Sequence, residues 1–182
     1  MNNPALIIID MQNCMQTWRP AERNNPQAEQ HIAALLQAWR HAGRPVIHVR
    51  HISRETTSAF APGQSGAAFQ AAFTPQPDEH IVEKNVPDAF IQSGLERWLH
   101  VRGIRELVIV GVATNNSVES TARSAGNLGF TTTVVADATY AYARPDYAGV
   151  ARSAQEVHLM SLANLDGEYA SVRTTVDVLA LL

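Results

Sequence analysis

Three polar side chains stand beside apolar runs of the sequence. Asp10 follows the run ALIII, Lys84 follows HIVE, and Ser117 ends the segment GVATNNS that follows LVIV. A carboxylate, an ammonium group and a hydroxyl group are components of nucleophilic catalytic sites, in which a base takes the proton of the attacking hydroxyl. Ligands of open parallel sheets bind beyond the carboxyl ends of the strands, so residues at these places can share one crevice. The three residues are therefore candidate catalytic groups.

Each candidate also has a purely structural interpretation. Asp10 can cap a turn, Lys84 can be a solvated charge at a sheet edge, and Ser117 can be the N-cap of the following helix. Of the two asparagines before the serine, Asn116 can orient Ser117 or a substrate. Helix capping is an equally good interpretation of Asn115 and Asn116. The catalytic interpretation therefore depends on the elements that position these residues.

Short apolar runs rich in Ile and Val alternate with longer segments of helical periodicity. Uninterrupted apolar runs are typical of strands buried on both faces, as in a parallel sheet. The predicted strands cover 5–9, 45–49, 80–83, 107–111 and 132–137. The predicted helices cover 27–42, 92–101 and 118–128, each with an apolar stripe and a glycine just beyond its end. This alternation implies right-handed βαβ crossovers and predicts a three-layer α/β fold with a mostly parallel central sheet.

The remaining segments complete this expectation. A further helix is predicted over 147–165, a short edge strand over 169–172, and a closing helix over 175–182 that begins with a threonine cap. Gly and Pro concentrate in 53–77, the longest segment without a clear period. A loop of this length in a compact domain is usually a lid or a binding loop, and it can equally be an oligomer contact.

The composition limits the class of protein. The chain has 182 residues, 46% of them hydrophobic, which suits one core and predicts a single domain over 1–182. Lys and Arg number 14 against 17 Asp and Glu, and without a basic run we expect a small-molecule partner rather than nucleic acid or a membrane. The N-terminal apolar stretch is too short for a signal peptide or a membrane span. The single cysteine, Cys14, fits a reducing compartment, so we expect a soluble cytoplasmic protein.

Four strings of the sequence resemble one known family. They are IIIDMQN (7–13), VEKNVPDAF (82–90), GVATNNSVESTARSAGNLGF (111–130) and SLANLDGEYA (161–170). On these strings the chain is identified as a member of the isochorismatase-like, or cysteine hydrolase, superfamily, and the resemblance covers most of the chain. It implies a doubly wound three-layer α/β fold and a catalytic triad of Asp, Lys and Cys.

The resemblance assigns roles to the three candidates, with one departure. Asp10 and Lys84 match the Asp and Lys of the triad, whereas Ser117 stands where the family usually has its nucleophilic cysteine. A thiol with a pKa of about 8.5 is partly ionised near neutrality, but an alcohol must lose its proton to a base during attack. Ser117 would therefore need Asp10, or Lys84 in its neutral form, as general base. Ser–Lys pairs act as nucleophiles on other folds, so the replacement is chemically feasible.

The resemblance also implies a backbone arrangement around the serine. A cis peptide bond between Val112 and Ala113 would turn the N–H groups of Ala113 and Ser117 toward one point, as an oxyanion hole. Gln12 and Thr114 are then expected to support the site from behind.

Aromatic and thiol side chains near the strand ends raise further possibilities. Trp18, Phe90 and Tyr140 are candidates for the pocket wall, and equally for core or interface positions. Cys14 lies beyond the first predicted strand, with no helix N-terminus obviously aimed at it, and it is displaced from the family motif. It is not expected to be the nucleophile.

Histidines raise the question of a metal. A subset of the family binds a divalent ion through an Asp and several His in the region after the second strand. Here the string is HVRHISRE, with no acidic residue between or just before His48 and His51, so the ligand set is incomplete. We expect these histidines, and His158 on the late helix, to lie in the core or the pocket wall, and we predict neither a metal nor a cofactor.

These inferences predict a metal-independent hydrolase of a small-molecule C–N bond of the amide type, acting through an acyl-enzyme on Ser117. One alternative is an isochorismatase-type vinyl-ether hydrolase that uses Asp10 as general acid without covalent catalysis. Another is a degenerate member that binds a metabolite or serves in an assembly. Because the family frequently forms dimers or tetramers, the resemblance also implies a homo-oligomer.

Overall fold

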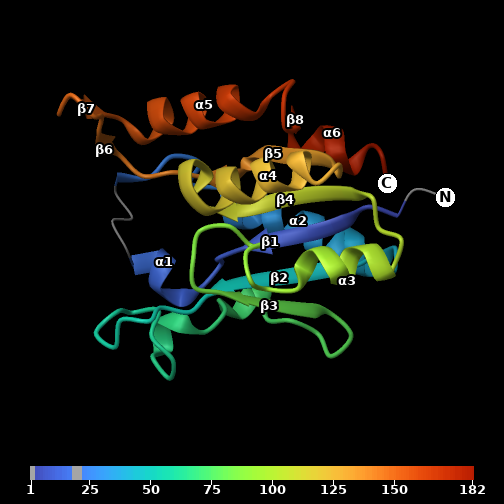
Figure 1. Ribbon diagram of the computed structural model, residues 1–182. Coiled ribbons are helices and arrows are strands. Elements are labelled where there is room, and N and C mark those ends of the chain that lie inside the picture. Colours follow the sequence, from blue (N-terminus) through green and yellow to red (C-terminus); the bar gives the residue numbers. More distant parts are fainter. Residues whose placement is uncertain (1–2, 18–21) are drawn as a thin grey trace.

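A computed structural model describes residues 3–17 and 22–182. Its centre is a six-stranded sheet in the order β3-β2-β1-β4-β5-β8, and every pair of neighbouring strands in it is parallel (Figure 1). The strands are β1 (Ala5–Ile9), β2 (Val46–His51), β3 (His80–Lys84), β4 (Glu106–Val112), β5 (Thr131–Tyr140) and β8 (Ser171–Arg173). Two further short strands, β6 (Arg144–Pro145) and β7 (Ala151–Arg152), form an antiparallel hairpin. The mostly parallel sheet predicted from the apolar runs is confirmed.

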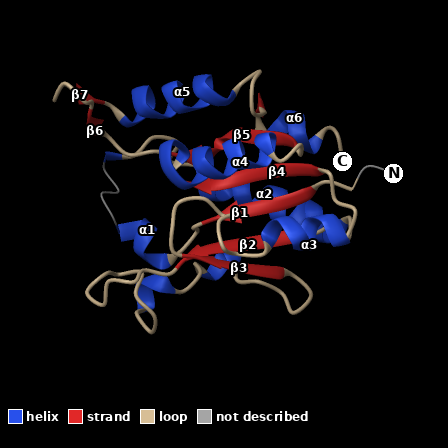
Figure 2. Cartoon of the chain, in the orientation of Figure 1, coloured by secondary structure: helices blue, strands red, loops and turns tan. Residues whose placement is uncertain are grey.

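Helices cover both faces of this sheet (Figure 2). They are α1 (Asn13–Thr17), α2 (Ala28–His41), α3 (Leu95–Val101), α4 (Glu119–Asn127), α5 (Ala154–Leu165) and α6 (Thr175–Leu179). Residues of α1, α2 and α6 share one core cluster with one face of the sheet, and residues of α3, α4 and α5 share the other. The fold is thus the predicted three-layer α/β sandwich.

Strand β1 shows why the predicted strands are apolar without interruption. Leu6 and Ile8 belong to the cluster beneath α2, whereas Ile7 and Ile9 belong to the cluster on the opposite face. All five residues of β1 are buried. Burying such a side chain removes apolar surface from water. For a fully buried Leu or Ile this stabilises the folded state by roughly 1.5–3 kcal/mol.

The order in which strands are added to the sheet reverses at β1: β2 and β3 follow on one side of it, and β4 and β5 on the other. Such a switch point leaves a crevice beyond the carboxyl ends of the two central strands. Close packing of β1 on β4 requires Gly111, whose φ is +121° and whose place leaves no room for a side chain. A Cβ there would lie 2.1 Å from the carbonyl oxygen of Ile9.

The predicted helix over 147–165 is too long, because α5 begins at Ala154. The Asp146 carboxylate accepts hydrogen bonds from the backbone N–H groups of Ala148 and Val150, which closes the turn between β6 and β7. The helix then starts at a capping box formed by Ser153 and Glu156. The spacing S-x-x-E was the sequence signal for this boundary.

Smaller differences occur at other element ends. The predicted helix over 92–101 begins only at Leu95, because Gln92 and Gly94 have φ values of +55° and +74°. Strand β5 extends beyond the predicted 132–137 after a register shift against β4, and the edge strand lies at 171–173 rather than 169–172. The closing helix ends at Leu179. Helix α1 was not predicted.

The long segment 53–77 is irregular apart from two 3₁₀ turns, Ser65–Ala67 and Ala71–Phe73. A β-bridge between Gln12 and Phe69 joins it to the residues just after β1. The segment therefore lies beside the carboxyl-terminal edge of the sheet. No helix in the part of the chain that the structure describes is both long and apolar enough to cross a membrane.

Candidate active site

Three side chains from distant segments meet at the carboxyl-terminal edge of the sheet. Asp10 follows β1, Lys84 is the last residue of β3, and Ser117 lies in a π-helical turn (Thr114–Val118) between β4 and α4. Lys84 Nζ lies 2.7 Å from Asp10 Oδ2 and 3.3 Å from Ser117 Oγ, and it donates a hydrogen bond to each. The carboxylate, the amine and the hydroxyl therefore form one contiguous group.

This group is almost completely buried. The exposed fractions are 5% for Asp10, 3% for Lys84 and 5% for Ser117, so Lys84 is not a solvated charge at the sheet edge. Low dielectric strengthens the attraction between the opposite charges, but each charge also loses its hydration. Asp10 Oδ1 has no hydrogen-bond partner within the described residues. That oxygen is available to accept a proton or a hydrogen bond from a bound molecule.

The backbone on either side of Asp10 is held by neighbouring segments. Asp10 has a φ of +52°, a left-handed conformation that Asp tolerates better than most residues, and its N–H donates to the Val49 carbonyl at 2.9 Å. The Gln12 amide accepts from the His51 N–H at 2.8 Å and donates to the carbonyls of His51 and Ala67 at 2.9 and 2.8 Å. Gln12 thus fastens the ends of β1 and β2 to the 53–77 segment.

The turn that carries Ser117 follows directly from β4. The peptide bond between Val112 and Ala113 is cis, and the Ala113 carbonyl accepts hydrogen bonds from the N–H groups of Asn116 and Val118 at 3.0 and 3.2 Å. The N-cap of α4 is Val118, and no side chain caps it. The capping interpretation of Ser117 is therefore wrong.

Helix α5 supports this turn through Thr114. Thr114 Oγ1 lies 2.9 Å from His158 Nδ1, and the Ser161 hydroxyl donates to the Thr114 carbonyl at 3.0 Å. Burial lowers the pKa of His158 to about 4, so its ring is neutral near pH 7. His158 is thus a buried hydrogen-bonding residue, as predicted, and it reaches the turn from the far helix.

A hollow of about 180 Å³ opens beside the group. Asp10 and Ser117 line it together with Met15, His51 and Phe60 among others. Burial and the nearby Lys84 charge both lower the pKa of His51, which favours a neutral ring, and Phe60 packs edge-on against that ring at 5.4 Å. The 53–77 segment, from which Phe60 comes, therefore supplies part of the wall.

A second hollow, of about 290 Å³, adjoins the first. Ala113 and Asn116 line both of them, and Asn115, Tyr142 and Arg144 line the second. Residues at the start of the turn that carries Ser117 thus contribute to the walls of both spaces.

Two of the aromatic candidates pack in or against the core. Phe90 packs against the core and stacks on Phe130, with ring centroids 5.8 Å apart. Tyr140 is fully buried, with the Arg23 guanidinium 4.0 Å from its ring centroid. Neither lines the two hollows, so of the alternatives left open the structure favours the core for Tyr140 and a place packed against the core for Phe90. Trp18 lies outside the described residues.

The remaining thiol and histidine have other surroundings. Cys14 lies in the first turn of α1, where burial raises the pKa of its thiol to about 11, so a thiolate is disfavoured. His48 is fully buried and its Nε2 lies 2.8 Å from Glu79 Oε2. Within residues 3–17 and 22–182, no group of three or more His, Cys, Asp or Glu side chains is arranged to hold a metal ion.

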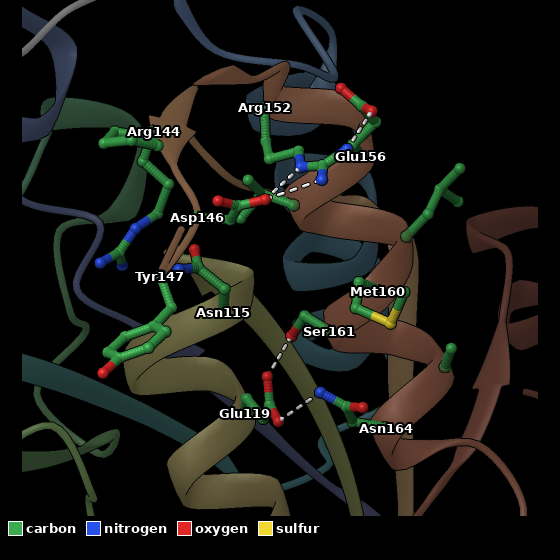
Figure 3. Close-up of a pocket in the computed structure, with 14 residues that line it drawn as sticks. Asn115, Glu119, Arg144, Asp146, Tyr147, Arg152, Glu156, Met160, Ser161 and Asn164 are labelled. Atoms are coloured by element: carbon green, nitrogen blue, oxygen red, sulfur yellow. Dashed lines mark hydrogen bonds and ion pairs between the residues drawn. The ribbon is translucent and has the colours of Figure 1, made fainter. Parts of the chain in front are cut away.

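A larger hollow, of about 820 Å³, lies on the other side of the serine turn, between α4, α5 and the β6–β7 hairpin (Figure 3). Most of its charged side chains have partners: Arg152 pairs with Asp146, and the Glu119 carboxylate accepts from Ser161 and Asn164. Asn115 and Arg144 line this hollow as well as the second one. Leu159 and Met160 of α5 are exposed along it. The three candidate catalytic side chains do not line this hollow.

The sequence interpretation did not name Met15, Phe60 or Pro87, which line the first hollow. Their only signal was position: each lies within a few residues of a strand end or in the long segment that follows β2. It also did not anticipate that Arg144 lines the second hollow, because no strand or hairpin was predicted between 137 and 147.

Comparisons with known proteins agree with this fold. The isochorismatase domain model matches residues 4–176. A solved structure of an isochorismatase family protein from Chromobacterium violaceum is 49% identical, covers 99% of this chain and 93% of that one, and superposes with a TM-score of 0.95.

Two curated relatives extend the comparison. The isochorismatase family protein YrdC of Bacillus subtilis is 38% identical over 171 residues, which cover 94% of this chain and 91% of YrdC. Nicotinamidase 3 of Arabidopsis thaliana is 29% identical over 175 residues, covering 88% of this chain and 79% of that enzyme. By these matches, the chain belongs to the isochorismatase family of hydrolases.

Proposed function

We propose that this protein hydrolyses a C–N bond of a small-molecule amide through an acyl-enzyme on Ser117. The observation that carries the proposal is the buried contact of Lys84 Nζ with both Asp10 Oδ2 and Ser117 Oγ beside a hollow of about 180 Å³. Similarity to nicotinamidase 3, named for an amide substrate, supports the choice of bond.

In the acylation step, Ser117 Oγ attacks the amide carbonyl carbon while its proton passes to Asp10. Oδ1 of that carboxylate is unpartnered in the structure and is suited to receive the proton. The Lys84 ammonium balances the negative charge that develops, and the backbone N–H groups of Ala113 and Ser117 would stabilise the oxyanion. Asp10 then gives the proton to the leaving amine as the C–N bond breaks.

In the deacylation step, water attacks the ester carbonyl and gives a proton to Asp10. The ester bond to Ser117 Oγ breaks, the carboxylic acid leaves, and the proton returns to the serine oxygen. Asp10 therefore acts as base and acid in turn, and Lys84 keeps its charge throughout.

The proposal is tested by assaying a panel of small primary amides with the native protein and with Ser117→Ala, Ser117→Cys and Asp10→Asn. Ser117→Ala and Asp10→Asn should each lower kcat/KM by about a thousandfold or more, because the residues of such a group act as a unit. Ser117→Cys should keep measurable turnover, since a thiol is the better nucleophile. Ser120→Ala, in the first turn of α4, is the matched serine control and should leave kcat/KM unchanged.

Other outcomes would identify the alternatives. Full turnover in Ser117→Ala with loss in Asp10→Asn would indicate hydrolysis without a covalent intermediate, as in the vinyl-ether hypothesis. No turnover in the native protein or in Ser117→Cys would indicate a metabolite-binding family member. Either result would overturn the acyl-enzyme.

A further inference from the structure

The second hollow contains a cation that no acidic side chain neutralises. Arg144 is exposed and lines both this hollow and the larger one, and its guanidinium makes no hydrogen bond or ion pair with any part of the chain that the structure describes. The acidic side chains nearby already have partners: Asp146 binds Arg152, and Glu119 binds Arg123. Figure 3 shows the Arg144 side chain extending away from the Asp146–Arg152 pair, with none of its dashed contacts.

Uncharged donors accompany this arginine. Asn115 and Asn116 line the same hollow, and neither carboxamide is hydrogen-bonded to another residue within the described ranges. Neither asparagine caps a helix, since the caps of the π-helical turn and of α4 carry no side-chain hydrogen bond. One guanidinium with two free carboxamides suits one singly charged planar anion, because guanidinium and carboxylate match in a two-bond geometry. A phosphate dianion would call for more positive charge than this hollow holds.

The two hollows together are large enough for a substrate that neither holds alone. The space beside Ser117, at about 180 Å³, is smaller than ordinary ligand pockets of about 300–1,000 Å³. The adjoining space, of about 290 Å³, shares Ala113 and Asn116 with it as wall residues. An amide whose carbonyl lies at Ser117 and whose chain passes Asn116 would reach the hollow that Arg144 lines.

We infer that the substrate is an amide that also carries a carboxylate, and that Arg144 binds this carboxylate and so determines specificity. The inference rests on the proposed function for the place of the amide, and it adds the chemical class of the rest of the molecule. The β6–β7 hairpin, whose first strand contains Arg144, thereby becomes a specificity element of the site.

Matched pairs of probes test the inference. Succinamate and butyramide differ only by a carboxylate in place of a methyl group, and glutaramate with valeramide repeats the comparison with one more methylene. Their dissociation constants are measured by calorimetry in the Ser117→Ala background, so that no probe is consumed, and kcat/KM is measured with Ser117 present. In at least one pair, the anionic amide should bind about tenfold or more tightly than its neutral partner.

Variants of Arg144 test whether this residue causes the preference for the anionic amide. Arg144→Ala should reduce the preference for the anionic amide to about one, and Arg144→Lys should keep only part of it, because lysine lacks the planar fork. Arg97→Ala, which removes the same charge from an exposed position on α3, is the control and should keep the full preference. No preference in any pair, or a preference that survives Arg144→Ala, would overturn the inference.

Failure of the inference is distinguishable from failure of the proposed function. If amides are hydrolysed through Ser117 but Arg144→Ala keeps the preference, the function stands and the inference falls. If no amide is hydrolysed but binding of the anionic probe depends on Arg144, the carboxylate site stands and the acyl-enzyme falls.

Discussion

At the scale of single residues, the site depends on a buried ion pair. Lys84 and Asp10 have side-chain exposures of 0% and 7%, so each charge is stabilised mainly by the other. Removing one member of such a pair leaves an uncompensated buried charge, which typically costs about 3–5 kcal/mol. The Lys84 ammonium group that donates to Ser117 Oγ is therefore also tied to Asp10, and losing either charge should destabilise the fold.

This dependence predicts non-additive stability. Lys84→Met and Asp10→Asn should each lower the free energy of unfolding, and the double variant should lose less than the sum by about 1 kcal/mol or more. Urea unfolding of the four proteins measures the coupling. The exposed Arg50–Glu83 pair is the control, with an expected coupling of about 0–1 kcal/mol. Additive losses at Lys84 and Asp10 would contradict a directly coupled pair.

At the scale of elements, the site depends on how closely β4 approaches β1. Gly111 pairs with Ile9 across these two strands, and the π-helical turn that carries Ser117 begins three residues later, at Thr114. Any side chain at this position would collide with the β1 backbone. The approach of the two central strands therefore places the turn over Asp10.

Substitution at this contact should be far more costly than at an ordinary glycine. Gly111→Ala should lower the free energy of unfolding by about 3 kcal/mol or more, or prevent folding, because a Cβ would lie 2.1 Å from the Ile9 carbonyl oxygen. Gly129→Ala is the matched control: its φ is +85° but nothing lies within 4 Å of the added Cβ, so a loss of about 1–2 kcal/mol is expected. If both variants lost a similar free energy of unfolding, the close contact between Gly111 and Ile9 would not explain the cost of a side chain at position 111.

At the scale of the whole molecule, a second polar cluster ties α2, β2 and the segment before β3 together. Glu79 accepts hydrogen bonds from the Arg40 side chain of α2 and from the Gln76 backbone N–H. Its Oε2 also lies 2.8 Å from Nε2 of His48, in β2. Burial alone would raise the pKa of Glu79, but these contacts outweigh it and lower the pKa to about 2. Glu79 directly precedes β3, at the end of that strand opposite Lys84, and Arg40 also donates to the Thr74 carbonyl near the end of the 53–77 segment.

The lowered pKa predicts a loss of stability in acid. The folded protein binds a proton at Glu79 less tightly than the unfolded chain does. The contribution of the ionised Glu79 carboxylate to the free energy of unfolding is therefore fully present above pH 4.5 and is lost as the pH falls toward 2. Glu79→Gln should therefore be less stable than the native protein at pH 6, and the difference should shrink by up to about 3 kcal/mol by pH 2. Denaturant unfolding across this range measures it. If the stability difference between the two proteins stayed constant with pH, the contacts of Glu79 would not lower its pKa as described.

Much of the fold was predictable from the sequence because its central strands are buried on both faces. The uninterrupted run in β1 and the stripe of α2 leave few other arrangements. The hairpin at 144–152 was missed because Asp146 and Ser153 fix its turn and the helix start through side-chain hydrogen bonds, which outweigh apolar spacing.

The site was predictable only in outline. Strand ends placed Asp10, Lys84 and Ser117 at one edge, but their contacts depend on long-range packing that periodicity does not encode. Phe90 and Tyr140 were equally near strand ends, but Tyr140 is buried, the partly buried Phe90 packs against the core, and neither lines the two hollows. That the chain acts as one domain and as a dimer or tetramer in the cytoplasm stays a prediction.

The nucleophilic role of Ser117 is tested most directly by acylation with p-nitrophenyl acetate. Stopped-flow measurement should show a burst of one p-nitrophenolate per chain, and mass spectrometry of the quenched protein should place one acetyl group on Ser117. The burst should be absent in Ser117→Ala and unchanged in Ser120→Ala. An acetyl group on Cys14, or a burst that persists in Ser117→Ala, would contradict the account.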